Sequence, residues 1–349
     1  MVLLLAVHLG PIAPGAPARQ PQLAANGSSV GVAFGAGNAI YYSASPDGGS
    51  TFSAPVKVAE AGSLMLGRHR GPRIAAMGNS IVITAVMGPP VAAGLHVPAR
   101  SPGGDLVSWH STDGGKTWSD GALVNDVPAA ANEGLHALGS DGHGKIFAAW
   151  LDKRSGHGTR LYGASSTNGI TWSKNVLIYE SPDGTICECC HPSVGIDSKG
   201  QIVVMWRNAL GGNRDLYLAR SADGVKFSKA EKLGTGSWKL NACPMDGGGI
   251  AISGDRIVTA WRREHDLFLA SPGGAETRLG SGMDVGIAGD ARGVYAIWSS
   301  PSGIQAATAG KAPVTLAASG AFPTIVALAD GRVLAAWEED GKISIQPVR

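Results

Sequence analysis

The most regular feature of the chain is a short apolar strand that ends in a large residue and recurs along the whole sequence. Clear copies lie at 146–150, 202–206, 257–261, 294–298 and 333–337, each ending in Trp, and weaker copies end at Phe34 and Met87. A tight turn rich in Gly, Asn and Asp precedes each copy, as in Asp141-Gly142. These residue types supply the positive φ angles that hairpin turns need. The pattern predicts seven repeated antiparallel units.

Further strands complete most of these units. A third strand is expected at 161–165 and 216–220, and a fourth at 176–179. Four short antiparallel strands, repeated without any helical pattern, are typical of a β-propeller. We therefore predict an all-β protein in which residues 1–349 form a single propeller domain of seven four-stranded blades, with six blades as the alternative.

A second signature follows the third strand of several units. Residues 45–52 (S-P-D-G-G-S-T-F) and 111–118 (S-T-D-G-G-K-T-W) both fit S-x-D-x-G-x-T-[FW], and shorter relatives lie at 166–172 and 221–227. This motif closely resembles the Asp-box, or BNR repeat, of sialidases and many other propellers, and the resemblance covers nearly the whole chain. The motif has a structural role, because the Asp accepts turn amide protons and the aromatic residue packs between strands.

The N-terminal segment has two interpretations. The last unit has only three strands, so the apolar run at 2–7 is expected to complete that blade and to cover an exposed sheet edge. Residues 1–18 also resemble a short signal peptide, because Ala16-Pro17-Ala18 matches an A-x-A cleavage site. We expect a secreted or periplasmic bacterial protein.

Composition narrows the choice of partners. The chain has 51 Gly, 20 Pro and only 16% charged residues, as expected of a turn-rich protein. A net charge of +2 gives no electrostatic reason for a nucleic-acid partner. No run approaches the roughly 18 apolar residues of a membrane span. We expect a monomer that binds a small molecule or a glycan.

The two faces of a propeller blade carry different loops, and the sequence can be sorted between them. Asp-boxes and first-to-second turns share one face, whereas inter-blade connections and second-to-third loops share the other, here called the top face. Reactive residue types gather on the top face of units 2 to 5, where a site is expected. The ligand-binding candidates are Arg73, Asp152, Arg154, Arg207, Arg214, Asp215 and Arg262, and the catalytic candidates are Glu133, His136, Asp246 and Arg207.

The four cysteines lie in two top-face connections, as C-x-C-C-H at 187–191 and C-P-M-D at 243–246. Thiolate and imidazole are ligands for Cu(I) and Zn(II). The predicted metal ligands are therefore Cys187, Cys189, Cys190, His191 and Cys243, with copper or zinc as the cofactor and with Met245, His69 and His136 as further candidates. Two alternatives remain open: a disulfide between Cys243 and one member of the triplet, and a redox-active thiol or vicinal disulfide.

The resemblance to sialidases implies a glycosidase with three arginines, a Tyr–Glu nucleophile pair and an Asp acid/base. Arg19-Gln20-Pro21 is similar to the R-I-P motif of that family, with Ile replaced, and Arg73, Arg207 and Arg262 lie on the correct face. However, the late top-face loops lack the tyrosine, and sialidases of this superfamily have six blades.

A closer resemblance is to bacterial sialidase-like proteins that carry a similar C-x-C-C motif paired with N-A-C-P-x-D-G. We therefore favour a top-face cysteine/histidine centre, a soft-metal or thiol redox site of unknown reaction; an enzyme would then be metal- or thiol-dependent. The alternatives are an exo-sialidase-type glycoside hydrolase, and a non-catalytic carbohydrate- or protein-binding propeller with structural disulfides.

Overall fold

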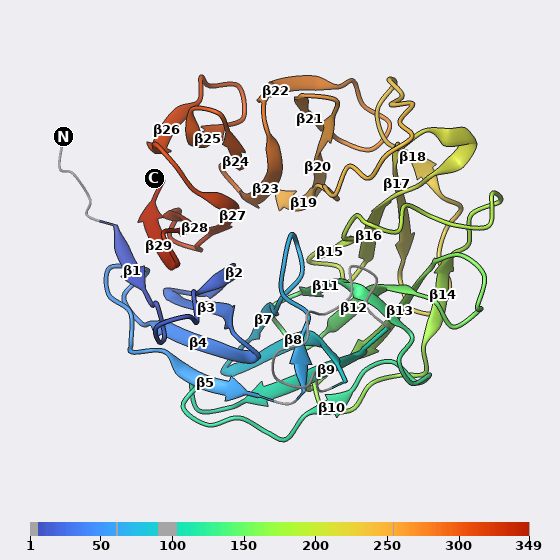
Figure 1. Cartoon of the computed structure of the whole chain (residues 1–349). Coiled ribbons are helices and arrows are strands. Elements are labelled where there is room, and N and C mark those ends of the chain that lie inside the picture. The colour runs from blue at the N-terminus through green and yellow to red at the C-terminus, as the bar shows by residue number, and fades with distance from the viewer. Residues whose placement is uncertain (1–5, 61, 90–102, 254, 349) are drawn as a thin grey trace.

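The computed structural model describes residues 6–60, 62–89, 103–253 and 255–348. Within them, seven antiparallel sheets stand like blades around a common centre (Figure 1). The innermost strands are β2 (Arg19–Asn26), β7 (Arg73–Met77), β11 (Ala131–Ser140), β15 (Ser193–Ile196), β19 (Gly249–Ser253), β23 (Met283–Asp290) and β27 (Ala321–Ala327). The prediction of an all-β propeller with seven blades is confirmed, and the six-bladed alternative is wrong.

The remaining strands build each blade outward. The second strands are β3 (Ser29–Ala36), β8 (Ser80–Gly88), β12 (Ile146–Asp152), β16 (Ile202–Arg207), β20 (Arg256–Arg263), β24 (Gly293–Ser300) and β28 (Val333–Glu339). The third strands are β4 (Ala39–Ser45), β9 (Asp105–Ser111), β13 (Arg160–Ser166), β17 (Leu216–Ser221), β21 (Asp266–Ala270), β25 (Gly303–Thr308) and β29 (Lys342–Pro347). The outer strands are β5 (Val56–Ala59), β10 (Ala122–Leu123), β14 (Val176–Tyr179), β18 (Glu231–Lys232), β22 (Thr277–Ser281) and β26 (Val314–Ala317).

Two elements depart from the regular pattern. Blade 2 has a fifth strand, β6 (Ser63–Leu64), which pairs with β8. A 3-10 helix, η1 (Leu210–Gly212), lies in the loop between β16 and β17. Within the described residues, the structure contains no helix with the length and apolar character needed to cross a membrane.

The N-terminal strand closes the ring. β1 (Val7–Leu9) pairs with β29 as the outer strand of blade 7, with Leu9 opposite Ile343 (Figure 1). Leu9 is buried and packs in the same cluster as Ile343. This pairing covers a sheet edge that would otherwise expose unpaired backbone groups. The predicted closure is confirmed, although the strand lies at Val7–Leu9 rather than at 2–7, and residues 1–5 lie outside the described part.

The core lies between blades. Trp150, Trp206, Trp298 and Trp337 are at most 2% exposed. Each packs against residues of the preceding blade, as Trp206 does against Phe147 of blade 3. Since side chains alternate across a strand, a second strand with neighbours on both faces must be apolar throughout. Burial of the second strand on both faces therefore explains the apolar run that recurs in the sequence.

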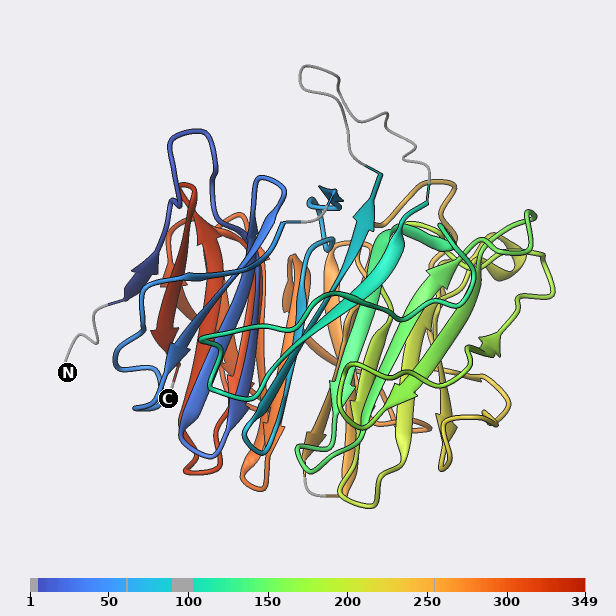
Figure 2. The same cartoon turned by 90° about the horizontal axis from the view of Figure 1, so that it is seen from below.

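Each Asp-box ties the end of its blade to the preceding blade. The Asp113 carboxylate accepts the backbone N–H and the hydroxyl of Thr117, at 3.0 and 2.7 Å. The aromatic residue then reaches across, as where Trp172 Nε1 donates to Ser108 Oγ of blade 2 at 2.9 Å. These turns share one face with the hairpins between first and second strands, and the side view in Figure 2 shows the short hairpins together at one end of the strands.

Acid is expected to weaken the Asp-boxes. Hydrogen bonds from Thr51 and Ser45 lower the pKa of Asp47 to about 2, and backbone and serine donors lower that of Asp223 to about 2. Because these pKa values lie below the unfolded value of about 3.9, the stabilisation is present above pH 4 and is lost as the pH falls toward 2.

The test is thermal unfolding between pH 4 and pH 2. The Tm of the wild type is expected to fall more steeply with pH than that of the triple variant Asp47→Asn, Asp113→Asn, Asp223→Asn. Asp120→Asn, at an exposed aspartate of the same blade face, is the control and should retain the wild-type slope. Equal slopes for the wild type and the triple variant would contradict the prediction.

Candidate functional site

A cavity of about 230 Å³ opens where the seven innermost strands meet. Every blade contributes to its lining, from Gln22 on β2 to Thr324 on β27. The titratable lining residues are His69, Arg73, His191 and Asp284. The central cavity therefore combines basic, acidic and imidazole groups on the axis of the propeller.

Backbone strain gathers where the chain enters these innermost strands. Six of the nine non-glycine residues with positive φ among the described residues lie there: Gln20 (55°), His69 (56°), Glu133 (52°), Met245 (53°), Asp284 (59°) and Phe322 (50°). Four innermost strands also shift register there, between 19 and 22, 131 and 136, 283 and 286, and 321 and 324. Such bulges re-aim side chains and are common beside active sites. The strain falls on the face that carries the candidate residues.

Three buried thiols form the most compact group on this face. The Sγ atom of Cys187 lies 3.8 Å from that of Cys189 and 3.6 Å from that of Cys190. All three Sγ atoms lie within 4.8 Å of one another. We call these three residues, which are 1%, 9% and 1% exposed, the cysteine cluster. Met245 packs against it, and Cys243 is exposed; all four cysteines are free thiols.

The cluster favours protonated thiols when it holds no metal. A hydrogen bond with Cys189, together with burial, raises the pKa of Cys187 to about 12. Burial raises the pKa of Cys190 to about 12. The contact with Cys187 lowers the pKa of Cys189, but Cys190, burial and the nearby Cys243 thiol raise it well above the usual value. A metal ion would therefore have to displace protons in order to bind.

Arg207 is a buried cation beside the cluster. Its side chain is 1% exposed, and its charge lowers the pKa of Cys187 and Cys190, opposing the effect of burial. The guanidinium donates to the carbonyl oxygens of Asp246 at 3.0 Å and Arg262 at 2.9 Å, and to that of Arg214. These bonds join β16 to the connection that leads into blade 5 and to β20 of that blade. Arg207 therefore stabilises both the blade interface and negative charge on the thiols.

Two histidines lie at the centre of the ring, beside the cysteine connection. The rings of His69 and His191 stack at 4.3 Å between centroids. His69 Nε2 lies 2.8 Å from Asp284 Oδ1, and His191 Nε2 lies 3.1 Å from the carbonyl oxygen of Gly248. His191 Nε2 must carry the proton, since a carbonyl only accepts. Its Nδ1 is therefore an unprotonated acceptor, buried without a partner in the described structure.

The environment keeps His191 neutral. Burial is the main cause that holds its pKa well below the usual value, and the positive charges of His69 and Arg73 act in the same direction. Arg73 is itself 8% exposed, and burial lowers its pKa to about 10. His191 is not among the donor atoms that lie within 4.8 Å of one another in the cysteine cluster. The compact donor group thus consists of sulfur alone.

Several predicted site residues are held by partners within the scaffold. Glu133 pairs with Arg70 at 2.6 Å, and Asp152 pairs with Arg154 at 2.9 Å. His136 is fully buried with Nε2 at 3.0 Å from Thr84 Oγ1, and burial lowers its pKa to about 3. The Glu133–Arg70 pair and the His136–Thr84 contact join blades 2 and 3, whereas Asp152 and Arg154 both belong to blade 3.

The other candidates lie between blades 4 and 5, near Arg207. Arg214 donates to the Leu240 carbonyl at 3.2 Å, Asp215 accepts the Trp238 N–H at 2.9 Å, and Arg262 donates to the Glu264 carbonyl at 2.6 Å. Asp246 is 1% exposed; its Oδ2 accepts the Asp284 N–H at 2.9 Å, and its Oδ1 has no partner in the described structure.

The pairing of His69 with Asp284 was missed by the sequence interpretation, which considered His69 only as a further metal ligand. One signal for Asp284 was available. It lies 14 residues before Trp298, the spacing that separates His136 from Trp150. That spacing marks the start of an innermost strand.

Solved structures with similar architecture include proteins of several kinds. A protein of unknown function from Dyadobacter fermentans has a TM-score of 0.59 and 18% identity over 99% of this chain and 98% of its own. The GH93 α-L-arabinofuranosidase of Fusarium graminearum, solved with arabinobiose, gives 0.57 and 13% over 99% and 97%. The intramolecular trans-sialidase from Ruminococcus gnavus gives 0.52 and 11% over 95% and 94%. The chain has the fold of the sialidase-like propellers.

The likeness to these sialidase-like propellers extends to the fold, and at such low identity it assigns no activity. No protein-family model matches the sequence, and no curated protein matches it. The prediction of a sialidase-like propeller from the Asp-boxes is thus confirmed for the fold. The resemblance of the C-x-C-C motif to bacterial sialidase-like proteins stays a prediction.

Proposed function

We propose that this propeller binds one soft metal ion, Cu(I) or Zn(II), through Cys187, Cys189 and Cys190. The observation that carries the proposal is the spacing of the sulfur atoms. At a metal–sulfur distance of about 2.3 Å, two thiolates of a tetrahedral site lie about 3.8 Å apart. The spacings of 3.8 Å and 3.6 Å in the cysteine cluster match that separation closely.

Cys243 is the fourth ligand in this proposal. Its thiol interacts with Cys189, and the chain bends beside it at Met245, which has a φ of 53° and packs on the cluster. An all-sulfur donor set suits soft Cu(I) and also Zn(II), and it disfavours hard cations such as Mg²⁺. Arg207 offsets part of the negative charge of the thiolates.

The burial of the cysteine cluster indicates which role a bound metal would have. A site with all its ligands supplied by the protein holds a metal structurally or hands it on, whereas a hydrolytic site keeps an open position for water. We therefore propose metal binding, with thiol redox chemistry as the alternative use of the same sulfur atoms. That alternative is favoured by the 3.6 Å approach of Cys187 and Cys190.

A sialidase-type glycosidase has less support in the geometry. That chemistry needs a tyrosine at the site, and the nearest candidate, Tyr295, is fully buried in β24 with its hydroxyl directed to Asp290 at the β23–β24 turn. Glu133 and Asp152 are each paired with an arginine.

The test is elemental analysis of protein purified without chelators or affinity metal, with a free-thiol count on the same sample. Close to one copper or zinc per chain is expected, together with four titratable thiols after the metal is stripped under reducing conditions. Protein without metal and with fewer than four free thiols before reduction would overturn the proposal in favour of a disulfide.

A further inference from the structure

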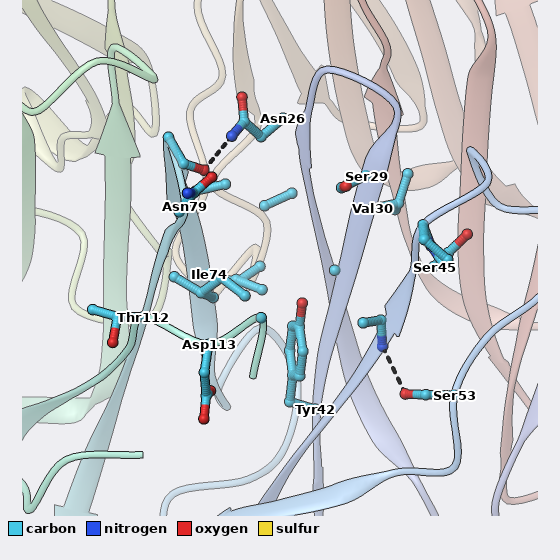
Figure 3. A pocket seen from close by; sticks show the side chains of 18 residues that line it. Asn26, Ser29, Val30, Tyr42, Ser45, Ser53, Ile74, Asn79, Thr112 and Asp113 are labelled. Carbon is cyan, nitrogen blue, oxygen red and sulfur yellow. Dashed lines mark hydrogen bonds between the residues drawn. The ribbon is translucent and has the colours of Figure 1, made fainter. Parts of the chain in front are cut away.

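A second cavity lies away from the cysteine cluster, on the Asp-box face. It has a volume of about 530 Å³ and lies between blades 1 and 2. Figure 3 shows Tyr42 and Ile74 inside it, with Asn26, Asn79 and Asp113 around it. Its size falls in the range of pockets that hold small molecules.

A glycine allows Tyr42 to lie against the blade 1 wall of this cavity. In the four Asp-box blades, one second-strand residue pairs with the residue just before the Asp-box serine. It is Gly31 in blade 1, and Val82, Phe147 and Val203 in the next three blades. The larger side chains fill the space toward the next blade. At Gly31 this space is taken by the Tyr42 ring and by Ile74 of blade 2, which would lie 2.7 and 3.1 Å from a Cβ added there.

The opposite walls make the gap wide and apolar. Ala24 and Ala44 flank Gly31 on the neighbouring strands, and Ile74 and Ile81 face them from blade 2. Covering such recessed apolar surface with an apolar ligand is favourable, because water is displaced from it. The cavity is therefore suited to an apolar body about the size of a substituted aromatic ring.

The polar groups that line the cavity are mostly uncharged hydroxyl and amide side chains. Burial raises the pKa of Tyr42 to about 12, so its phenol is neutral and can donate. No hydrogen bond to the Tyr42 hydroxyl is found among the described residues. Among the described residues that line the cavity there is no Lys, Arg or His, and the one carboxylate, Asp113, accepts from Thr117 inside the Asp-box. An anionic ligand would find no opposite charge.

We propose that this inter-blade cavity is a binding site for a neutral, flat, largely apolar small molecule with one hydrogen-bond acceptor, as in an aromatic ketone. The Tyr42 hydroxyl donates to that acceptor, and the apolar body lies between blades 1 and 2 against Ile74 and Ile81. The site is separate from the cysteine cluster and does not depend on the proposed metal.

The probes are acetophenone and its anionic counterpart benzoate, titrated into the full-length protein and followed by protein-observed NMR and calorimetry. Acetophenone is expected to bind saturably and benzoate at least tenfold more weakly. Tyr42→Phe should weaken acetophenone about fivefold to tenfold, as the loss of one hydrogen bond predicts. Tyr41→Phe is the matched control, since Tyr41 stacks on Phe34 at 5.9 Å on the other side of blade 1, and it should bind as the wild type does.

A variant that fills the cavity tests the site without changing Tyr42. Ala24→Leu places a side chain in the cavity and should abolish binding while the protein still unfolds cooperatively. No saturable binding of acetophenone to the wild type would overturn the proposal, as would equal affinity for benzoate. Unchanged affinity in both Tyr42→Phe and Ala24→Leu would also overturn it.

Discussion

Cys190→Ser is expected to remove the bound metal almost completely. Cys190 is 1% exposed, and its Sγ lies 3.6 Å from that of Cys187. Neither water nor a neighbouring donor can therefore take the place of the lost thiolate. A serine hydroxyl is a hard, protonated ligand that suits neither Cu(I) nor a zinc–thiolate site. We expect the metal content to fall below about 0.1 per chain and the affinity to fall by at least about 100-fold, measured by elemental analysis and competition with a chelator.

Two further variants test how much Cys243 and Met245 contribute to metal binding. Cys243→Ser alters the exposed thiol and should weaken binding less than Cys190→Ser does, because water can occupy its position. Met245→Leu keeps the apolar packing on the cluster and should retain the metal, unless the thioether is itself a ligand. Cys190→Ser protein that still holds one metal per chain would show that the cluster is not the binding site.

The same site should respond steeply to pH. Burial and mutual hydrogen bonding raise the pKa values of Cys187 and Cys190 to about 12, so the three thiols of the cysteine cluster alone release up to three protons when a metal binds them near neutral pH. The apparent affinity should therefore fall as the pH falls, by up to about 1000-fold for each pH unit. An affinity independent of pH between 6 and 8 would contradict thiolate ligation.

The fold could be read from the sequence because its signals are local. The second strand of a blade is covered on both faces and must be apolar throughout. Runs like those that end at Trp150 and Trp206 therefore recur from blade to blade. The Asp-box is likewise contained in eight consecutive residues, whose hydrogen bonds run from Asp113 to Thr117. The cysteine cluster was found for the same reason, since its members span only four positions.

The rest of the site depends on contacts that sequence spacing does not reveal. His69 and Asp284 are 215 positions apart, and ring closure brings blades 2 and 6 to one channel. His191 directly follows the cysteines, yet its ring stacks on His69 rather than joining the sulfur group. Tyr42 lies in the inter-blade cavity because Gly31 has no side chain beside it, and a single glycine of this kind gives no motif.

Arg207→Met is expected to be the most destabilising of the top-face substitutions. Methionine keeps the apolar stem but removes the donors to the carbonyl oxygens of Asp246, Arg214 and Arg262. A buried acceptor left without a donor costs about 1–3 kcal/mol, so the free energy of unfolding should fall by about 3 kcal/mol or more, measured by urea denaturation. Arg214→Met is the control, because its guanidinium donates to one carbonyl and is only half-buried; it should cost about 1 kcal/mol.

Arg207 should also influence the pKa values of the thiols, and this effect can be measured separately from its effect on stability. Since the charge of Arg207 lowers the pKa of Cys187 and Cys190, its removal raises both values and weakens metal binding at neutral pH. Arg207→Lys keeps a positive charge but loses the fork of donors that reaches three carbonyls. We therefore expect Lys to restore metal affinity more fully than it restores stability, whereas a purely structural arginine would show both losses in proportion. Metal affinity that is unchanged in a folded Arg207→Met variant would contradict the electrostatic role and leave Arg207 as a clamp between blades 4 and 5.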